Sequence, residues 1–142
     1  MILPDINLLV YAYNADAPHH KTALTWWEKT LSQGIPVGLP WAVICGFIRL
    51  MTDNRILRIP LSAGVAVEHV ESWLAQPGVS LLHPGPQHLT ILRKLFAEAG
   101  AAGRLTTDIH LAALAIEYHA ELHTNDRDFE RFKLLRRHNP LE

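Results

Sequence analysis

The chain has little of what several large classes of protein require. Its 142 residues include one cysteine, Cys45, which excludes an internal disulfide framework and a zinc centre built on cysteines. The longest apolar run, from Leu39 to Ile48, is far shorter than the roughly 20 residues that span a bilayer. No basic and apolar leader precedes Asp5. We therefore expect a cytoplasmic protein that is not associated with a membrane.

The chain also has no excess of positive or negative charge. The 13 lysines and arginines nearly balance 14 acidic residues, for a net charge of -1, so contact with nucleic acid would require a local basic patch. The nine histidines are scattered, and neither His19-His20 nor the pair His119 and His123 has a third ligand at zinc spacing. Hydrophobic residues make up 49% of the chain, which suits a single domain over residues 1–142 with a real core.

Short apolar runs alternate with longer amphipathic patterns along the chain, which is typical of an α/β fold with a mostly parallel sheet. The runs predict five strands, of which the last is weak: Ile2-Leu3, Pro36 to Leu39, Val79 to Leu82, Glu121 to Thr124 and Leu134-Leu135. The amphipathic patterns predict helices over 7–13, 18–32, 41–52, 62–75, 86–99 and 108–119. Gly34 is expected to end the second of these helices.

Three aspartates stand at predicted junctions between a strand or loop and the next element. Asp5 follows the first strand, Asp108 opens a helix, and Asp126 follows the fourth strand. Open α/β sheets bind ligands at the carboxyl ends of their strands. Two carboxylates about 4 Å apart repel by about 4 kcal/mol at an effective dielectric near 20, so a cluster of them should bind a cation or hold a proton. Convergence of the three predicts a metal-dependent enzyme acting on phosphates.

Each aspartate taken alone has a simpler explanation. Asp5 and Asp108 could cap helices, and Asp126 could stabilise a turn. A phosphoacceptor domain of the receiver type also clusters aspartates at strand ends. That chemistry needs a lysine after a late strand, and only Lys133 is available, beyond the wrong element. The set of three junctions together favours a metal site.

Three stretches resemble the PIN-domain ribonucleases, and more narrowly the VapC-type toxins of bacterial toxin–antitoxin pairs. They are Leu3 to Ala12 at the start, Leu39 to Thr52 in the middle, and Thr107 to Ala115 with Thr124 to Phe129 at the end. The resemblance covers essentially the full length. It implies a three-layer α/β/α sandwich, an endoribonuclease that depends on Mg²⁺ or Mn²⁺, a homodimer, and a small cognate antitoxin that blocks the site.

The resemblance also implies roles for individual residues. The acidic positions of the family fall on Asp5, Asp108 and Asp126, as catalytic residues and metal ligands, with Asp128 as an accessory ligand. Asn7 and the hydroxyl of Thr124 are candidates to hold these carboxylates in place, although each could equally be a turn or cap residue.

One position departs from the family pattern. The family usually has a glutamate on the helix after the second strand, and the matching residue here is Gly46. The neighbouring Cys45 is a poor substitute for a hard oxygen ligand. Weaker metal binding, or a ligand supplied by water, follows as a hypothesis. The alternative function is a catalytically inert PIN-like module that binds RNA or a partner.

Local positive charge is the candidate for binding the RNA substrate or the antitoxin. Arg127 and Arg131 belong to a run of basic residues beside the last acidic motif, and Arg49 shares a helix face with Gly46. Arginine can bind a phosphate through two donors at once, and an exposed Trp41 could stack on an unpaired base. The same residues could instead be a solvated surface and, for Trp41, core packing.

Overall fold

Five parallel strands form the centre of the computed structural model, which describes all residues 1–142. Their order across the sheet is β3-β2-β1-β4-β5, and every neighbouring pair is parallel. The prediction of an α/β fold with a largely parallel sheet is confirmed. The strands are β1 (Ile2–Pro4), β2 (Val37–Pro40), β3 (Val79–Leu82), β4 (Glu121–His123) and β5 (Arg137–His138).

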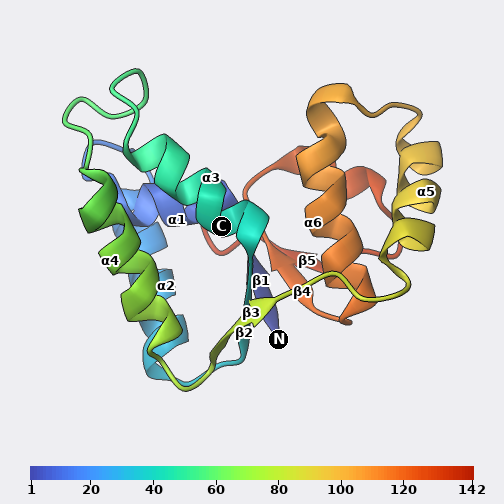
Figure 1. The fold of residues 1–142 in the computed structure, drawn as a ribbon, viewed down its shortest axis with the longest axis horizontal. Helices are drawn as coiled ribbons and strands as arrows, with labels where there is room; N and C mark the ends of the chain where they lie inside the picture. The colour runs from blue at the N-terminus through green and yellow to red at the C-terminus, as the bar shows by residue number, and fades with distance from the viewer.

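Helices cover both faces of the sheet, as the three-layer prediction requires. One group, α1 to α4, lies on one side, and α5 and α6 lie on the other (Figure 1). Each of these helices is too short or too polar to span a lipid bilayer. The helices are α1 (Ile6–Tyr13), α2 (His20–Ser32), α3 (Trp41–Met51), α4 (Ala63–Leu74), α5 (His88–Ala99) and α6 (Thr106–Glu117), with short 3₁₀ turns η1 (Gly103–Leu105) and η2 (Arg127–Arg131).

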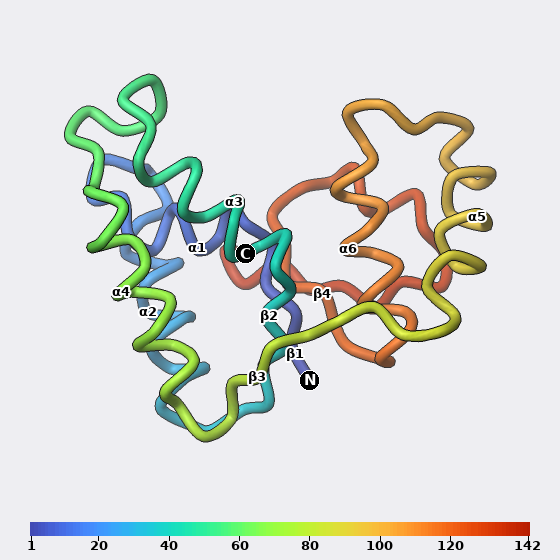
Figure 2. Tube along the Cα trace, in the orientation of Figure 1, coloured from blue at the N-terminus to red at the C-terminus, as the bar shows by residue number.

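The direction in which the sheet is built reverses between β1 and β4. The strands β1, β2 and β3 follow one another outward, whereas β4 and β5 extend the other edge. Leu3 pairs with Leu122 and Pro4 with His123, so β1 and β4 end at the same level although they come from opposite ends of the chain (Figure 2). Such a reversal is where open α/β sheets place their ligands.

The core between the sheet and helices α1 to α4 is built on large aromatic side chains. Trp27, Trp73 and Phe47 are fully buried. Trp73 meets Phe47 edge-on with ring centroids 4.7 Å apart and Trp27 in the same way at 5.5 Å, the arrangement that aromatic pairs prefer. Two of the four tryptophans are therefore core, whereas Trp41 is 52% exposed.

The predicted position of the fifth strand is wrong. Leu134 and Leu135 lie in a turn, with Leu134 76% exposed and Leu135 buried in the core. The strand is instead Arg137–His138, which pairs with Leu122 and His123. An edge strand pairs through its backbone and needs no apolar side chains. The apolar signal at this point reflects the contact of Leu135 with the core. Gly34 follows α2 as predicted, with φ at +64°.

Candidate metal centre

Asp5 lies between β1 and α1, where the chain passes from sheet to helix. Its backbone amide donates to the carbonyl of His123 at 2.9 Å, and its Oδ1 accepts from the amide of Ile6 at 2.7 Å. Only 5% of the residue is exposed. This burial raises the pKa of the carboxyl, although the bonds from Thr124 and Ile6 act in the opposite direction. The charged form of Asp5 is thus held in place but poorly solvated.

Thr124 joins two of the predicted aspartates. Its hydroxyl donates to Oδ2 of Asp5 at 2.8 Å and accepts from the amide of Asp126 at 3.0 Å. Oδ1 of Asp126 in turn accepts from the amide of Asp128 at 2.8 Å. One continuous set of hydrogen bonds therefore runs from the end of β1 to the turn after β4. The structure brings Thr124 to Asp5 across 119 positions of sequence, and Asp126 with it.

Asp108 reaches the same region from the first turn of α6. The pKa of its carboxyl is raised to about 6, first by burial and then by the negative charges of Asp5, Asp126 and Asp128. Mutual repulsion of this kind requires that the four carboxylates share one electrostatic neighbourhood. We call Asp5, Asp108, Asp126 and Asp128 the acidic centre.

Arg131 is the positive charge that acts on the acidic centre. It lowers the pKa of Asp108, against the larger upward effect of burial and the carboxylates. Its Nη2 lies 3.6 Å from Oδ1 of Asp128, and its Nε donates to the carbonyl of Asp128 at 2.9 Å. The Asp128 side chain is about half exposed. Arg131 therefore lies at the solvent edge of the acidic centre, whose net charge remains negative.

Two other predicted residues form no hydrogen bond with the acidic centre. Asn7 is exposed and its side chain forms no hydrogen bond. Arg49 is exposed near the end of α3 and lines a shallow hollow with Asp53 and Arg55. The pKa of Asp53 is held below its usual range by the bonds from Arg55 and, more weakly, by the charge of Arg49. Arg49 thus faces the loop after α3.

Gly46 shows why no side chain occupies the position of the family's glutamate. A Cβ at Gly46 would lie 2.6 Å from Cδ1 and 3.1 Å from Cγ1 of Ile6. Ile6 directly follows Asp5, and its branched side chain is stiff. Helix α3 therefore packs against α1 with an apolar side chain in the space that a longer residue would need. This position of α3 therefore supplies no carboxylate.

A polar hollow of about 390 Å³ adjoins Asp126. Arg127 lies here and pairs with Glu130 at 3.6 Å. The sequence analysis did not identify several of the lining residues. They form or follow β5, and the fifth strand had been predicted at residues 134–135 instead of 137–138. The hollow is lined by Thr124, Asn125, Asp126, Arg127, Glu130, Arg137, His138, Asn139 and Glu142.

The donors of the acidic centre suit a hard divalent cation. No group of three or more His, Cys, Asp or Glu side chains lies close enough together to hold a metal ion, but Mg²⁺ takes only one or two carboxylates directly and completes its shell with water and phosphate. Each oxygen of Asp5 accepts one hydrogen bond and keeps a second lone pair. The pKa of Asp108 is raised first by burial and then by the neighbouring carboxylates, and a bound cation would relieve the second of these effects.

We predict that Asp108→Asn stabilises the protein in metal-free buffer at pH 7.5. The raised pKa means that ionised Asp108 destabilises the fold above about pH 6, and that this effect disappears as the pH falls toward the ordinary value of 3.8. Solvent reaches this half-buried group and weakens the effect, so the substitution should raise the free energy of unfolding by about 1 kcal/mol and Tm by about 3–5 °C. Thermal unfolding at pH 7.5 and pH 4 measures it.

The matched control is Glu71→Gln on the exposed surface of α4, which should change Tm little at either pH. The gain for Asp108→Asn should shrink at pH 4. A variant less stable than the parent protein at pH 7.5, with the control unchanged, would contradict the repulsion.

Comparison with known proteins identifies the family. The PIN domain matches residues 2–135. Over 141 residues the chain is 45% identical to Ribonuclease VapC33 of Mycobacterium tuberculosis, covering 99% of both chains. The fold is similar to VapBC2 from Rickettsia felis, solved bound to a DNA fragment of its promoter, with a TM-score of 0.70 over 98% of each chain at 17% identity. VapC20 of M. tuberculosis, a toxin that cleaves the sarcin-ricin loop, gives 0.68 at 19% identity, over 96% of this chain and 99% of that one.

These matches cover nearly the whole chain. The sequence identity to VapC33, 45%, is far above the 17% and 19% of the two solved structures that share the fold. The sheet reversal and the acidic centre lie inside the matched range. The chain belongs to the PIN-domain family of VapC ribonuclease toxins of toxin–antitoxin systems.

Proposed function

We propose that the chain is an endoribonuclease that uses Mg²⁺, or Mn²⁺ in its place, to hydrolyse RNA phosphodiester bonds at the acidic centre. The observation that carries this is geometric: the Thr124 hydroxyl donates to Asp5 at 2.8 Å and accepts from the amide of Asp126 at 3.0 Å, at the edge where β1 and β4 end. The pKa of the nearby Asp108 is raised first by burial and then by the neighbouring carboxylates, and clustered carboxylates of this kind bind a cation or hold a proton. A divalent cation would offset their charge and bind a phosphate.

Asp5, Asp108 and Asp126 are the proposed ligands, with Asp128 as an accessory. Asp5 is held by two donors, whereas the half-exposed Asp128 side chain is paired only with Arg131, at 3.6 Å. When bound, Mg²⁺ lowers the pKa of water and neutralises charge on the phosphate. A carboxylate that does not contact the ion can accept a hydrogen bond from the attacking water and so orient it. Thr124 positions Asp5 and Asp126 relative to one another.

Arg131 and Arg127 are the proposed contacts to RNA beside this centre. Both lie in η2, directly after Asp126, and arginine binds phosphate oxygens through paired donors. Each is tied to a neighbouring acid, Arg131 to Asp128 and Arg127 to Glu130. An arriving phosphate would compete with those acids. Arg49, at the loop after α3, is proposed to contact the antitoxin.

The proposed setting is that of a toxin held in check. VapBC2 was crystallised as a toxin–antitoxin complex bound to DNA, and by analogy we propose a small cognate antitoxin and a homodimer for this chain. We further propose that residues 1–142 act as one domain in the cytoplasm. The continuous core that joins residues from β1 to Leu135 supports the single domain.

One observation favours the alternative, an inert PIN-like module that binds RNA or a partner. Gly46 packs against Ile6 where the family has a glutamate, which leaves fewer carboxylates to hold a cation. Binding of RNA without cleavage, in Mg²⁺ and in Mn²⁺, would select this alternative.

We predict that Asp126→Asn lowers kcat/KM for cleavage of single-stranded RNA by at least roughly 100-fold, because it removes a charged ligand. Thr124→Val keeps the side-chain shape but loses the bond to Asp5, and should cost about 10-fold to 100-fold with weaker Mg²⁺ binding. Cleavage of a fluorescent RNA with added Mg²⁺ measures both, and calorimetry measures Mg²⁺ binding.

The control variant is Asp16→Asn, an exposed acid paired with Arg58 away from the acidic centre; it should cleave normally. Undiminished cleavage by Asp126→Asn that a chelator still abolishes would refute the proposed role of Asp126. Cleavage that survives the chelator in every variant would refute the dependence on a metal, once a fresh preparation has excluded a contaminating ribonuclease.

We predict that Arg131→Ala raises KM for RNA about tenfold with a small change in kcat, as expected for loss of one charged phosphate contact of about 1.4 kcal/mol. Removing this charge should also raise the pKa of Asp108 further, so the acid limb of the pH–rate profile should move to higher pH. Steady-state cleavage across pH 5–8 in roughly half-unit steps provides both readings.

Arg49→Ala serves as the comparison, since it removes an equal charge at the loop after α3. It should leave KM for RNA unchanged and weaken antitoxin binding. If Arg131→Ala changes neither KM nor the pH profile, Arg131 does not contact the substrate.

A further inference from the structure

The molecule has a second hollow, larger than the one beside Asp126. It has a volume of about 480 Å³ and lies between α2 and the end of the chain. Its polar lining consists of Lys21, Thr22, Thr25 and Lys29 with Trp26 from the same helix, and His138 of β5. No aspartate or glutamate lines it. We call it the α2 groove.

Two lysines give the α2 groove a net positive charge. Lys21, Thr25 and Lys29 are spaced four residues apart, which places them along one face of the helix. Both lysines are exposed, and neither ammonium forms an ion pair. They are separated by eight residues, or about 12 Å along the helix axis, so they can reach different phosphates of one strand. The threonine hydroxyls between them can donate to the same backbone.

Trp26 is fixed in the wall of this groove by a chain of hydrogen bonds. Its Nε1 donates to Nδ1 of His123 at 3.0 Å. Because Nδ1 accepts, the proton of this imidazole is on Nε2, which donates to Oε1 of Glu121 at 2.9 Å. The indole is half-buried. A rigid, partly exposed aromatic ring beside positive charge is the combination that binds single-stranded nucleic acid.

His138 connects the α2 groove to the metal centre. It lines this groove and also the polar hollow that contains Asp126. The two hollows are therefore adjacent parts of one surface that runs from Asp126 past β5 to α2. An RNA strand whose reacting phosphate lies at Asp126 must leave the centre on some side, and this side offers free cations and an aromatic ring.

We propose that the α2 groove binds the single-stranded RNA that flanks the cleaved bond, with Lys21 and Lys29 on its phosphates and Trp26 against a base. The proposal rests on the ribonuclease function proposed above and extends it to a named subsite. A protein partner with acidic side chains presents similar charges, but the continuity with Asp126 favours the polyanion that must pass through the metal centre.

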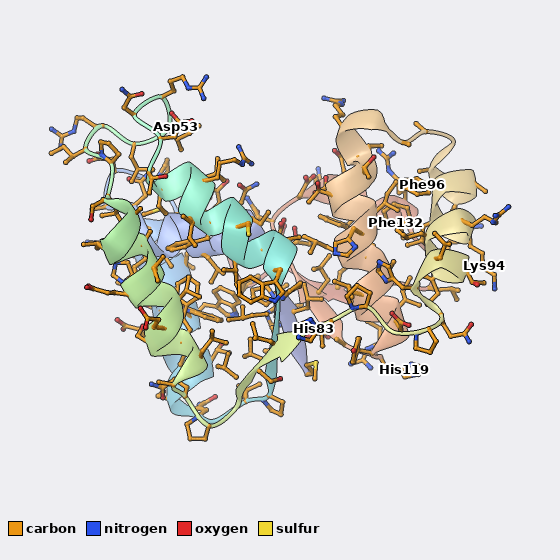
Figure 3. All side chains as sticks on the ribbon, viewed as in Figure 1. Asp53, His83, Lys94, Phe96, His119 and Phe132 are labelled. Carbon is orange, nitrogen blue, oxygen red and sulfur yellow. The ribbon has the colours of Figure 1, made fainter.

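The test compares two variants that each lose two positive charges. Lys21→Gln with Lys29→Gln alters the groove, whereas Arg93→Gln with Lys94→Gln alters exposed residues of α5, on the opposite side of the molecule from α2 (Figures 1 and 3). Binding of a short fluorescein-labelled single-stranded RNA is measured by anisotropy with Ca²⁺ in place of Mg²⁺, over a range of salt. Cleavage in Mg²⁺ and binding of the antitoxin are measured in parallel.

The groove variant should bind RNA about tenfold more weakly, with KM raised and kcat unchanged. The slope of log affinity against log salt should fall in magnitude by about 1.4, since each neutralised phosphate of a single strand contributes about 0.7. The α5 variant should match the parent protein. Antitoxin binding should be unchanged in both.

Equal RNA affinity and salt slope in the two variants would overturn the proposal. So would a groove variant that loses antitoxin binding but keeps RNA binding, which would assign the groove to the protein partner. If the protein binds RNA through the two lysines but never cleaves it, the proposed nuclease activity is refuted and the proposed RNA-binding role of the α2 groove stands. If the protein cleaves RNA equally well with and without the two lysines, the nuclease activity stands and the role of the groove is refuted.

Discussion

The hydroxyl of Thr124 donates to Oδ2 of Asp5 at 2.8 Å and accepts from the amide of Asp126 at 3.0 Å, and the metal centre depends on this pair of bonds. They connect the end of β1 with the turn after β4 and hold a carboxylate that is only 5% exposed. Without the hydroxyl, Asp5 would be a buried charge with one donor fewer. With it, Asp5 is tied to the turn that carries Asp126, and Asp108 in α6 lies near enough that the charges of both, after burial, raise its pKa.

The sheet topology makes this contact possible. Because β1 and β4 are parallel neighbours with Pro4 opposite His123, the residues after both strands emerge at one edge. The reversal of strand order at this point keeps the first turns of α1 and the turn after β4 from covering each other. The position of the site is thus a consequence of strand order, and its chemistry is a consequence of which residues follow the strands. The same geometry places the polar hollow and the α2 groove in one continuous surface through His138.

Local sequence patterns predicted what depends on local structure. Asp5 and Asp126 could be found because each follows a short apolar run, and β3 could be placed because Val79 to Leu82 is bounded by Pro77-Gly78. The direction in which individual helix residues face was harder to predict. Asn7 matches the family motif but points to solvent, and Arg49 shares a helix with Gly46 but faces the loop after α3. The edge strand at Arg137–His138 has no apolar signal, so its neighbours Asn125 and Asn139, which bond to one another at 2.9 Å, were missed. The α2 groove could not be seen at all, since its two sides are far apart in sequence.

The central claim is that one divalent cation is shared by the carboxylates of the acidic centre, and anomalous diffraction from crystals soaked in Mn²⁺ tests it most directly. The account predicts one anomalous peak, or two about 3.5–4 Å apart, in contact with oxygens of at least one of Asp5, Asp108 and Asp126, and bridged to the others by water. Bound Mn²⁺ found only elsewhere on the protein, with these carboxylates in their metal-free positions, would contradict it.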